Sequence, residues 1–254
     1  MSASLRFAAN LSTLWTDLPL EMRARRAAAA GFREVEILFP YDENAAQLAR
    51  LLKRLSLSVA LINGPPPNYT GGERGFAAIP GREGRFRSDF RRALRYAKAL
   101  GARAIHVMAG PAEGAEAEET FVANLHHAAE AAPDRLLTIE PLNPGDAPGY
   151  FLSDYDRAAR ILEAVDRPNV ALQFDAYHAQ IITGDLLGAW DRHGARAAHV
   201  QIADAPGRGA PGTGRAPLGA FLDRLAAEGF AGAVAAEYRA EGDVEATLGW
   251  RAGR

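Results

Sequence analysis

The second half of the chain places four oxygen-bearing side chains at the ends of short apolar runs. Glu140, Asp175, Gln201 and Glu237 each close such a run, and about one strand–helix unit separates each from the next. A carboxylate buried that deep in apolar sequence costs free energy unless it is paired or binds a metal. Three carboxylates and an amide oxygen suit Mg²⁺ or Mn²⁺, with water or substrate completing the coordination sphere. We therefore predict a divalent metal site here, although a single such glutamate could instead cap a helix or pair with an arginine.

A long irregular segment follows the third apolar run. Asn63 lies where that run ends, and the segment Asn63–Glu83 after it contains Arg74 and Arg82 among several prolines and glycines. A loop of this length inside a compact domain is usually functional or disordered. Its charges suggest a lid over a charged ligand, while an extended surface excursion fits the pattern as well.

Two more residues could contact a ligand of the predicted site. His178 lies three residues after Asp175, close enough to reach a ligand oxygen, and a structural histidine is an equal interpretation. Arg208 lies in the segment Gly207–Gly214 after the seventh run, where it could hold a substrate anion.

Short apolar runs alternate with segments of helical periodicity, such as Phe86–Leu100 and Thr120–Ala132, along the whole chain. Eight strand–helix units predict an α/β fold, a single (β/α)₈ TIM barrel domain over residues 1–254, with an open doubly wound sheet as the alternative. The active site of such a barrel lies at the carboxyl ends of its strands. The expected strands are Leu5–Asn10, Glu34–Leu38, Leu57–Ile62, Ala104–Met108, Leu136–Glu140, Val170–Asp175, Ala197–Ile202 and Ala233–Glu237.

Composition excludes several kinds of site. The 254-residue chain has no cysteine, which rules out disulfides and thiolate chemistry, and only two lysines, Lys53 and Lys98, both in helix-like segments. A formal net charge of −2 with no basic face argues against a nucleic-acid partner. No run is long enough to span a membrane and no signal peptide is evident, so we expect a cytoplasmic protein without a membrane partner. No nucleophile elbow or dinucleotide-binding glycine motif is present.

Several segments resemble a known family. The sequence is similar, nearly end to end, to hydroxypyruvate isomerases, within the superfamily of xylose-isomerase-like barrels that also contains ketose 3-epimerases and endonuclease IV. IEPLN and D-x-x-H are shared across the superfamily, whereas the GERG…IPGRE loop and the glutamine of HVQIAD favour the hydroxypyruvate isomerase branch. The segments that carry the resemblance are Phe7–Ser12 (FAANLS), Phe39–Tyr41 (FPY), Gly72–Gly75 (GERG), Ile79–Glu83 (IPGRE), Ile139–Asn143 (IEPLN), Gln173–His178 (QFDAYH), His199–Asp204 (HVQIAD), Pro211–Gly214 (PGTG) and Glu237–Tyr238.

The resemblance implies roles for individual residues. The metal ligands would be Glu140, Asp175, Gln201 and Glu237. Glu140 and Glu237 would also donate and accept the proton that interconverts hydroxypyruvate and tartronate semialdehyde through an enediolate. Sugar epimerases usually have histidine where this chain has Gln201, which argues against that branch. Endonuclease IV, which binds three zinc ions, needs many more histidines than this chain supplies.

A substrate of this kind is a small 2-oxo acid, and its carboxylate needs a cationic partner. Because guanidinium binds carboxylates bidentately, the candidates are Arg74, Arg82 and Arg208. Isomerisation of a four-carbon 2-oxotetronate meets the same requirement and stays open, with C3 epimerisation of a ketose as a further alternative. A non-catalytic barrel that binds sugar acids is the alternative from a different class, and homo-oligomerisation is possible in each case.

Overall fold

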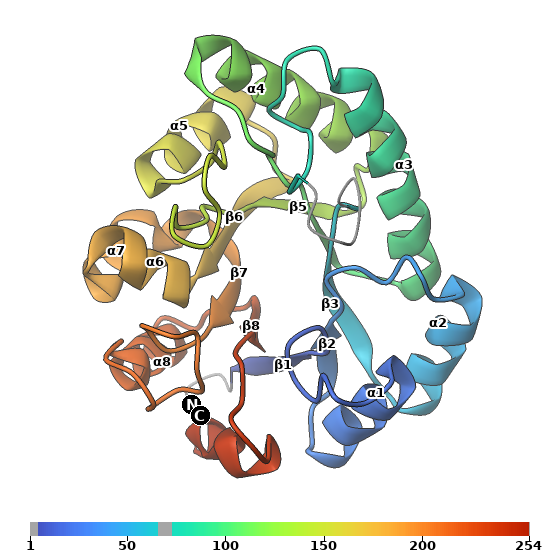
Figure 1. Cartoon of the computed structure of the whole chain (residues 1–254), viewed down its shortest axis with the longest axis vertical. Coiled ribbons are helices and arrows are strands. Elements are labelled where there is room, and N and C mark those ends of the chain that lie inside the picture. Colours follow the sequence, from blue (N-terminus) through green and yellow to red (C-terminus); the bar gives the residue numbers. More distant parts are fainter. Residues whose placement is uncertain (1–4, 66–72, 254) are drawn as a thin grey trace.

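Eight parallel strands close into a barrel in the computed structural model, which describes residues 5–65 and 73–253 (Figure 1). Neighbouring strands in the barrel follow sequence order, and β1 pairs with β8 to complete the circle. The predicted barrel is therefore confirmed, and the open-sheet alternative is wrong. The strands are β1 (Arg6–Asn10), β2 (Glu34–Glu36), β3 (Ser58–Asn63), β4 (Ala104–His106), β5 (Leu136–Ile139), β6 (Val170–Asp175), β7 (Ala197–Ile202) and β8 (Ala233–Ala236).

Helices surround the barrel on its outside (Figure 1). Within the described ranges, none of them is both long and apolar enough to cross a lipid bilayer. The α-helices are α1 (Leu20–Ala29), α2 (Ala45–Arg54), α3 (Glu83–Leu100), α4 (Gly114–Ala131), α5 (Tyr155–Val165), α6 (Ala176–Thr183), α7 (Leu186–His193) and α8 (Leu218–Ala227), with 3₁₀ turns η1 (Gly194–Arg196) and η2 (Glu245–Arg251).

Side chains alternate between two environments along each strand, as a period of two requires. One set, which includes Val35, Leu137 and Phe174, packs with the helices in the main hydrophobic core. The other set faces the barrel interior. There, four alanines form a separate small cluster: Ala8, Ala60, Ala233 and Ala235. Toward the other end of the interior, buried polar side chains such as Thr138, Gln173 and Gln201 bond to one another.

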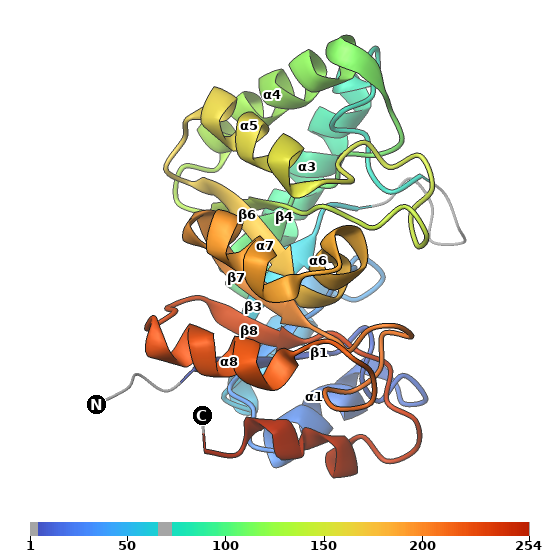
Figure 2. The same cartoon turned by 90° about the vertical axis from the view of Figure 1, so that its left-hand side faces the viewer.

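The connections that follow the strands gather at one end of the barrel, on the right in Figure 2. Glu140 and Glu237 lie one residue beyond β5 and β8, instead of being the last residue of each strand as the sequence predicted. Asp175 and Gln201 are register partners on β6 and β7. The barrel therefore brings the ends of four consecutive strands to one mouth.

The segment after β3 folds back onto the segment after β4. Residues 66–72 of the predicted Asn63–Glu83 loop lie outside the described residues, whereas Gly75 forms a bridge with Ala109. A side chain at Gly75 would clash with Met108, and one at Gly110 would approach the Gly75 carbonyl oxygen within 2.2 Å. Glycine at both positions therefore allows two backbones to touch at the rim of the mouth.

We expect Gly110→Ala to destabilise the protein by about 3 kcal/mol, since it adds a backbone overlap to the cost of a positive φ. Gly31→Ala is the matched control, because Gly31 has nearly the same φ (84° against 85°) but no heavy atom within 4 Å of the point where a β-carbon would lie. The control should cost only about 1 kcal/mol. Urea denaturation of both variants measures the difference, and equal losses would contradict the packing argument.

Candidate active site

Eight polar side chains, one at or next to the end of each strand, are buried around the barrel mouth. They are Asn10, Glu36, Asn63, His106, Glu140, Asp175, Gln201 and Glu237. None of them is more than 7% exposed, although four carry a carboxyl group. Such burial is costly unless each group is paired, so the partners of each decide what the site can do.

Arg208 joins two of the predicted carboxylate ligands. Its guanidinium lies 3.2 Å from Asp175 Oδ2 and 2.9 Å from Glu237 Oε1. A third carboxylate, Asp146, lies 3.8 Å away, and the ring of Tyr177 stacks below the guanidinium at 5.1 Å. The predicted substrate-binding arginine is thus within the predicted metal site.

Asp175 uses its two carboxylate oxygens differently. Because α6 starts directly after β6, Asp175 is the N-cap of this helix, and its Oδ1 accepts a hydrogen bond from the Tyr177 amide. This bond fixes the carboxylate so that Oδ2 faces Arg208. The short step from strand to helix also places His178 on the first turn, next to the site.

Buried side-chain hydrogen bonds link the strand ends to one another. Gln201 Nε2 donates to Glu36 Oε2 at 3.1 Å, and Gln201 Oε1 accepts from Gln173 Nε2 at 2.7 Å. Gln173 Nε2 also donates to Glu140 Oε2 at 2.9 Å, while its Oε1 accepts from Thr138 Oγ1. A continuous polar chain therefore runs from β2 through β7 and β6 to the end of β5.

No sequence pattern assigned a role to Glu36, Gln173 or Thr138. A signal for the latter two was available, because each lies two residues before a predicted ligand and so faces the same side of its strand. Glu36 is recognisable in the sequence only as a strand-end residue. Its partners, Gln201 and His199 on β7, are far away in sequence and adjacent only in the closed barrel.

His178 is a hydrogen-bond donor toward the site. Its Nδ1 accepts from the backbone amide of Asn143 at 3.0 Å, so in the neutral ring the proton is on Nε2. Burial, followed by the charge of Arg208, lowers the pKa of His178 well below its usual value and keeps the ring neutral. Nε2–H lies 3.6 Å from Asp175 Oδ2. This tautomer suits a contact with a substrate oxygen better than metal coordination.

His106 carries its proton on the other ring nitrogen. Its Nδ1 lies 3.3 Å from Asn63 Oδ1 and 3.4 Å from Glu140 Oε2, which are both acceptors. Burial lowers the pKa of His106 to about 3, so the ring is neutral with its proton on Nδ1. Asn63, a predicted substrate contact, therefore lies beside Glu140 with its amide oxygen directed to His106.

The loop that carries Arg208 is held by a buried aspartate. Asp204 Oδ1 accepts from the amides of Ala205 and Ala216, and Oδ2 accepts from the amide of Gly212. Arg208 itself has a φ of 57°, a left-handed conformation that the loop imposes. Asp204 thus fixes the loop from which Arg208 reaches into the mouth.

The two remaining arginines differ in position. Arg74 donates to the backbone oxygen of Asp146, the residue whose side chain also pairs with Arg208. Arg82 immediately precedes α3 with an exposed side chain. In the described part of the chain, no hydrogen bond or ion pair connects Arg82 to another predicted site residue.

The acidic groups of the mouth hold their protons more tightly than usual. Burial raises the pKa of Glu237 to about 8 and that of Asp175 to about 6, although the attraction of Arg208 opposes both shifts. Burial, together with the charges of Asp175 and Glu237, raises the pKa of Glu140 well above its usual value. Burial by itself would lower the pKa of Arg208, because it disfavours the charged form. The negative charges of Glu237 and Asp175 outweigh this effect, so the pKa of the guanidinium is raised overall.

This donor set fits a hard divalent cation. Four carboxyl groups are buried here, counting Glu36, and Arg208 pairs with two of them, Asp175 and Glu237, so the described part of the site has more acidic groups than paired cations. Ligand atoms of Glu140, Asp175 and His178 lie within 4.8 Å of one another, close enough to hold one ion. Because His178 presents Nε2–H, the oxygen atoms of Glu140, Asp175 and Glu237 are the better ligands.

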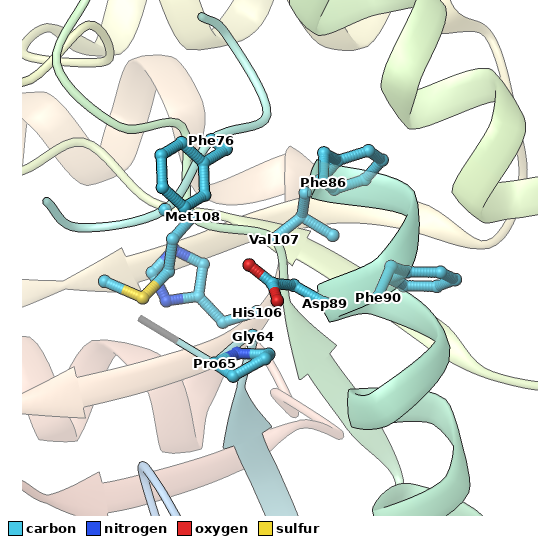
Figure 3. Close-up of a pocket in the computed structure, with 10 residues that line it drawn as sticks. Gly64, Pro65, Phe76, Phe86, Asp89, Phe90, His106, Val107 and Met108 are labelled. Atoms are coloured by element: carbon cyan, nitrogen blue, oxygen red, sulfur yellow. The ribbon is translucent and has the colours of Figure 1, made fainter. Parts of the chain in front are cut away.

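A separate pocket lies between α3 and the ends of β3 and β4 (Figure 3). It is lined mainly by apolar side chains, with Phe76, Phe86 and Phe90 around the carboxylate of Asp89. His106 is the one strand-end residue among the described side chains that line it. None of the four predicted metal ligands borders this pocket, and His106, which lies 3.4 Å from Glu140, connects it to the acidic mouth.

Comparison with known proteins places this chain in a family. The profile of the xylose isomerase-like TIM barrel family matches residues 24–254. The chain is 42% identical to the 2-oxo-tetronate isomerase of Cupriavidus necator, over 96% of both chains. It is 38% identical to the hydroxypyruvate isomerase of Escherichia coli, over 97% of this chain and 98% of that one. The crystal structure of AP endonuclease, family 2, from Brucella melitensis superposes with a TM-score of 0.92 at 43% identity and covers 98% of each chain.

We expect the metal-free protein to lose stability as the pH rises above neutrality. A carboxyl group whose pKa is raised on folding contributes stability below its unfolded pKa and loses it as the pH passes the folded value, about 8 for Glu237. The buried histidines have lowered pKa values and act in the opposite sense, but only below pH 6.5.

Thermal unfolding in EDTA, followed by circular dichroism, should therefore show Tm falling between about pH 6.5 and about pH 8 and levelling off above that, because the unfolded carboxyl group is already ionised and only the folded one still loses its proton in this interval. Glu237→Gln should reduce this fall, because the amide cannot lose a proton. A Tm that is constant or rises over this interval would show that the carboxyl groups are already ionised at neutral pH.

Proposed function

The chain belongs to the hydroxypyruvate isomerase family of xylose isomerase-like TIM barrels, and from this premise we propose that it interconverts hydroxypyruvate and tartronate semialdehyde with a bound divalent metal. The observation that carries the proposal is the pair of buried glutamates, Glu140 and Glu237. They flank Asp175 and Arg208 at the mouth, from the ends of β5 and β8. Burial raises the pKa of each glutamate above its usual value, so the acid form that a proton donor needs is favoured at both positions.

The reaction requires one proton to leave carbon and another to return to its neighbour. A glutamate in its carboxylate form removes a proton from C3 of hydroxypyruvate, and the bonding pair forms a C2–C3 double bond as the C2 carbonyl pair moves to oxygen. The other glutamate, in its acid form, gives a proton to C2. The C3 hydroxyl loses its proton to the C2 oxygen, which leaves an aldehyde at C3 and a hydroxyl at C2. The three-carbon acid keeps all of its atoms and electrons. The first glutamate ends protonated and the second ionised, and proton exchange with solvent returns both to their starting forms.

The C3 proton is too weakly acidic for a free carboxylate to remove at a useful rate. Mg²⁺ or Mn²⁺ held by Glu140, Asp175, Gln201 and Glu237 would supply a Lewis acid that polarises the substrate carbonyl. Asp175 and Glu237 would then be neutralised in part by the ion, and their ion pairs with Arg208 would weaken. Arg208 is then available to another anion.

The substrate carboxylate is such an anion. Arg208 and Arg74 converge on Asp146 at the mouth, so both guanidinium groups can reach a carboxylate placed there. His178 can donate its Nε2–H to a substrate oxygen beside Asp175. Arg82 has the weakest support of the three arginines, because its side chain is exposed at the start of α3.

A four-carbon substrate is the second candidate. The relative from Cupriavidus necator, named 2-oxo-tetronate isomerase, is 42% identical over nearly the whole chain. A 2-oxotetronate has the same carboxylate and carbonyl as hydroxypyruvate with one more hydroxylated carbon, so the same two glutamates can move its proton. The two substrates differ only in the space they need beyond the reacting carbons.

We expect Glu140→Gln and Glu237→Gln each to reduce turnover by a factor of at least about 10² while the fold survives, since each removes a group that transfers a proton. Glu241→Gln changes an exposed glutamate of the segment after β8 and is the matched control, with activity near that of the unchanged protein. Activity and Tm are measured on the same preparations. Near-normal turnover in either site variant would contradict the two-glutamate scheme.

Proton NMR in D₂O tests the reaction itself, with hydroxypyruvate and 2-oxotetronate offered separately, with Mg²⁺ or with EDTA. We expect metal-dependent product with deuterium on carbon, because the removed proton exchanges with solvent. Product without deuterium would support the isomerase but argue for shielded transfer. If neither acid reacts while a DNA substrate is cleaved, the name of the Brucella relative describes this chain better than the proposed isomerase function.

A further inference from the structure

We propose that Glu36 is a positioning residue that turns the side-chain amide of Gln201, so that its oxygen and not its nitrogen faces the metal ligands. The inference rests on the proposed function, because it assumes that Gln201 contributes Oε1 to the cation. Glu36 itself does not touch the substrate or the ion. It acts only through the orientation of its neighbour.

The carboxyl group of Glu36 accepts hydrogen bonds from two side-chain amides and also bonds to a histidine ring. Asn10 Nδ2 lies 2.8 Å and Gln201 Nε2 lies 3.1 Å from Glu36 Oε2, while His199 Nε2 bonds to Oε1. The side chain of Glu36 is fully buried, so water does not compete for these sites. The Gln201 group that faces Glu36 must therefore be the NH₂ group.

The other end of the polar chain imposes the same direction. Gln173 Nε2 donates to Glu140 Oε2, and the same NH₂ group donates to Gln201 Oε1. Two carboxylates, Glu36 on β2 and Glu140 after β5, thus lie at opposite ends of a chain of two amides. Because both ends accept, each amide has only one orientation in which every bond is made.

The orientation matters because an amide has one oxygen and one nitrogen at nearly equal positions. If Gln201 turned over, Oε1 would face the Glu36 carboxyl group and the NH₂ group would face the NH₂ group of Gln173. Both contacts would then be repulsive, and the cation would lose an oxygen ligand. A histidine at this position would meet a cation through a ring nitrogen, so this discrimination between oxygen and nitrogen is specific to glutamine.

A different explanation is that Glu36 acts through its negative charge alone. Shortening the side chain separates the two ideas, because Glu36→Asp keeps the charge but withdraws the carboxylate from Gln201 by one methylene group. Removing the neighbour separates them again, because an effect that passes through Gln201 disappears when Gln201 is alanine.

The experiment measures Mn²⁺ affinity by the electron paramagnetic resonance signal of free Mn²⁺. The variants are Glu36→Asp, Gln201→Ala and the double variant, with circular dichroism and Tm recorded to show that each folds. Glu34→Asp is the matched control: it makes the same change on the same strand, at a residue that pairs with Arg6. Residues that orient a metal ligand typically change metal affinity about 10- to 100-fold when they are replaced.

We expect Glu36→Asp to weaken Mn²⁺ binding at least about tenfold, Glu34→Asp less than about twofold, and Glu36→Asp less than about twofold when Gln201 is already alanine. Equal weakening in both backgrounds, or unchanged affinity in Glu36→Asp, would overturn the positioning role. Unchanged affinity in Gln201→Ala would remove Gln201 from the ligand set and overturn the inference, while leaving the isomerase reaction intact. If the unchanged protein binds no Mn²⁺, the proposed metal-dependent function fails first.

Discussion

Burial of several carboxyl groups in one barrel mouth is the constraint on which the rest of the site depends. Glu36, Glu140, Asp175 and Glu237 are all nearly inaccessible to solvent, so each must be protonated, hydrogen-bonded or paired with a cation. Arg208 supplies one positive charge, and the raised pKa values of Asp175 and Glu237 show that it is insufficient. A divalent cation bound at the mouth would supply the missing positive charge.

Polar side chains in the barrel interior next to the mouth bond to one another and to Glu140, and these bonds fix the orientation of the site residues. Gln173, Gln201 and Thr138 occupy positions that could carry branched apolar side chains, and below them the interior narrows to four alanines. A fully connected network of this kind specifies one arrangement, since each unmade bond would leave a buried donor or acceptor unsatisfied. The polar side chains bury less apolar surface in the barrel interior than aliphatic ones would. In return, their hydrogen bonds fix the orientations of the side chains at the mouth.

The segments that follow the strands hold the backbone of the site in place, while the long side chain of Arg208 can change its partner. Asp175 is fixed at the start of α6, and Asp204 holds the loop of Arg208 through three backbone amides. Arg208 reaches the mouth from that loop on a long side chain, so it can exchange one anionic partner for another while the backbone stays in place. The carboxyl groups, by contrast, come from strand ends that cannot move without disturbing the barrel.

The sequence by itself determined the barrel, because hydrophobic periodicity and turn residues act locally and recur eight times. It also identified Glu140, Asp175, Gln201 and Glu237 as strand-end residues, since parallel strands in a closed barrel must bring such ends together. Only the tertiary structure decided which groups touch. The bonds from Glu36 to His199 and Gln201 connect residues more than 160 positions apart, and they arise because closing the barrel turns β2 and β7 toward a shared interior. Likewise, the tautomers of His106 and His178 depend on Asn63 and Asn143, which lie on other segments of the mouth and which no local pattern pairs with them.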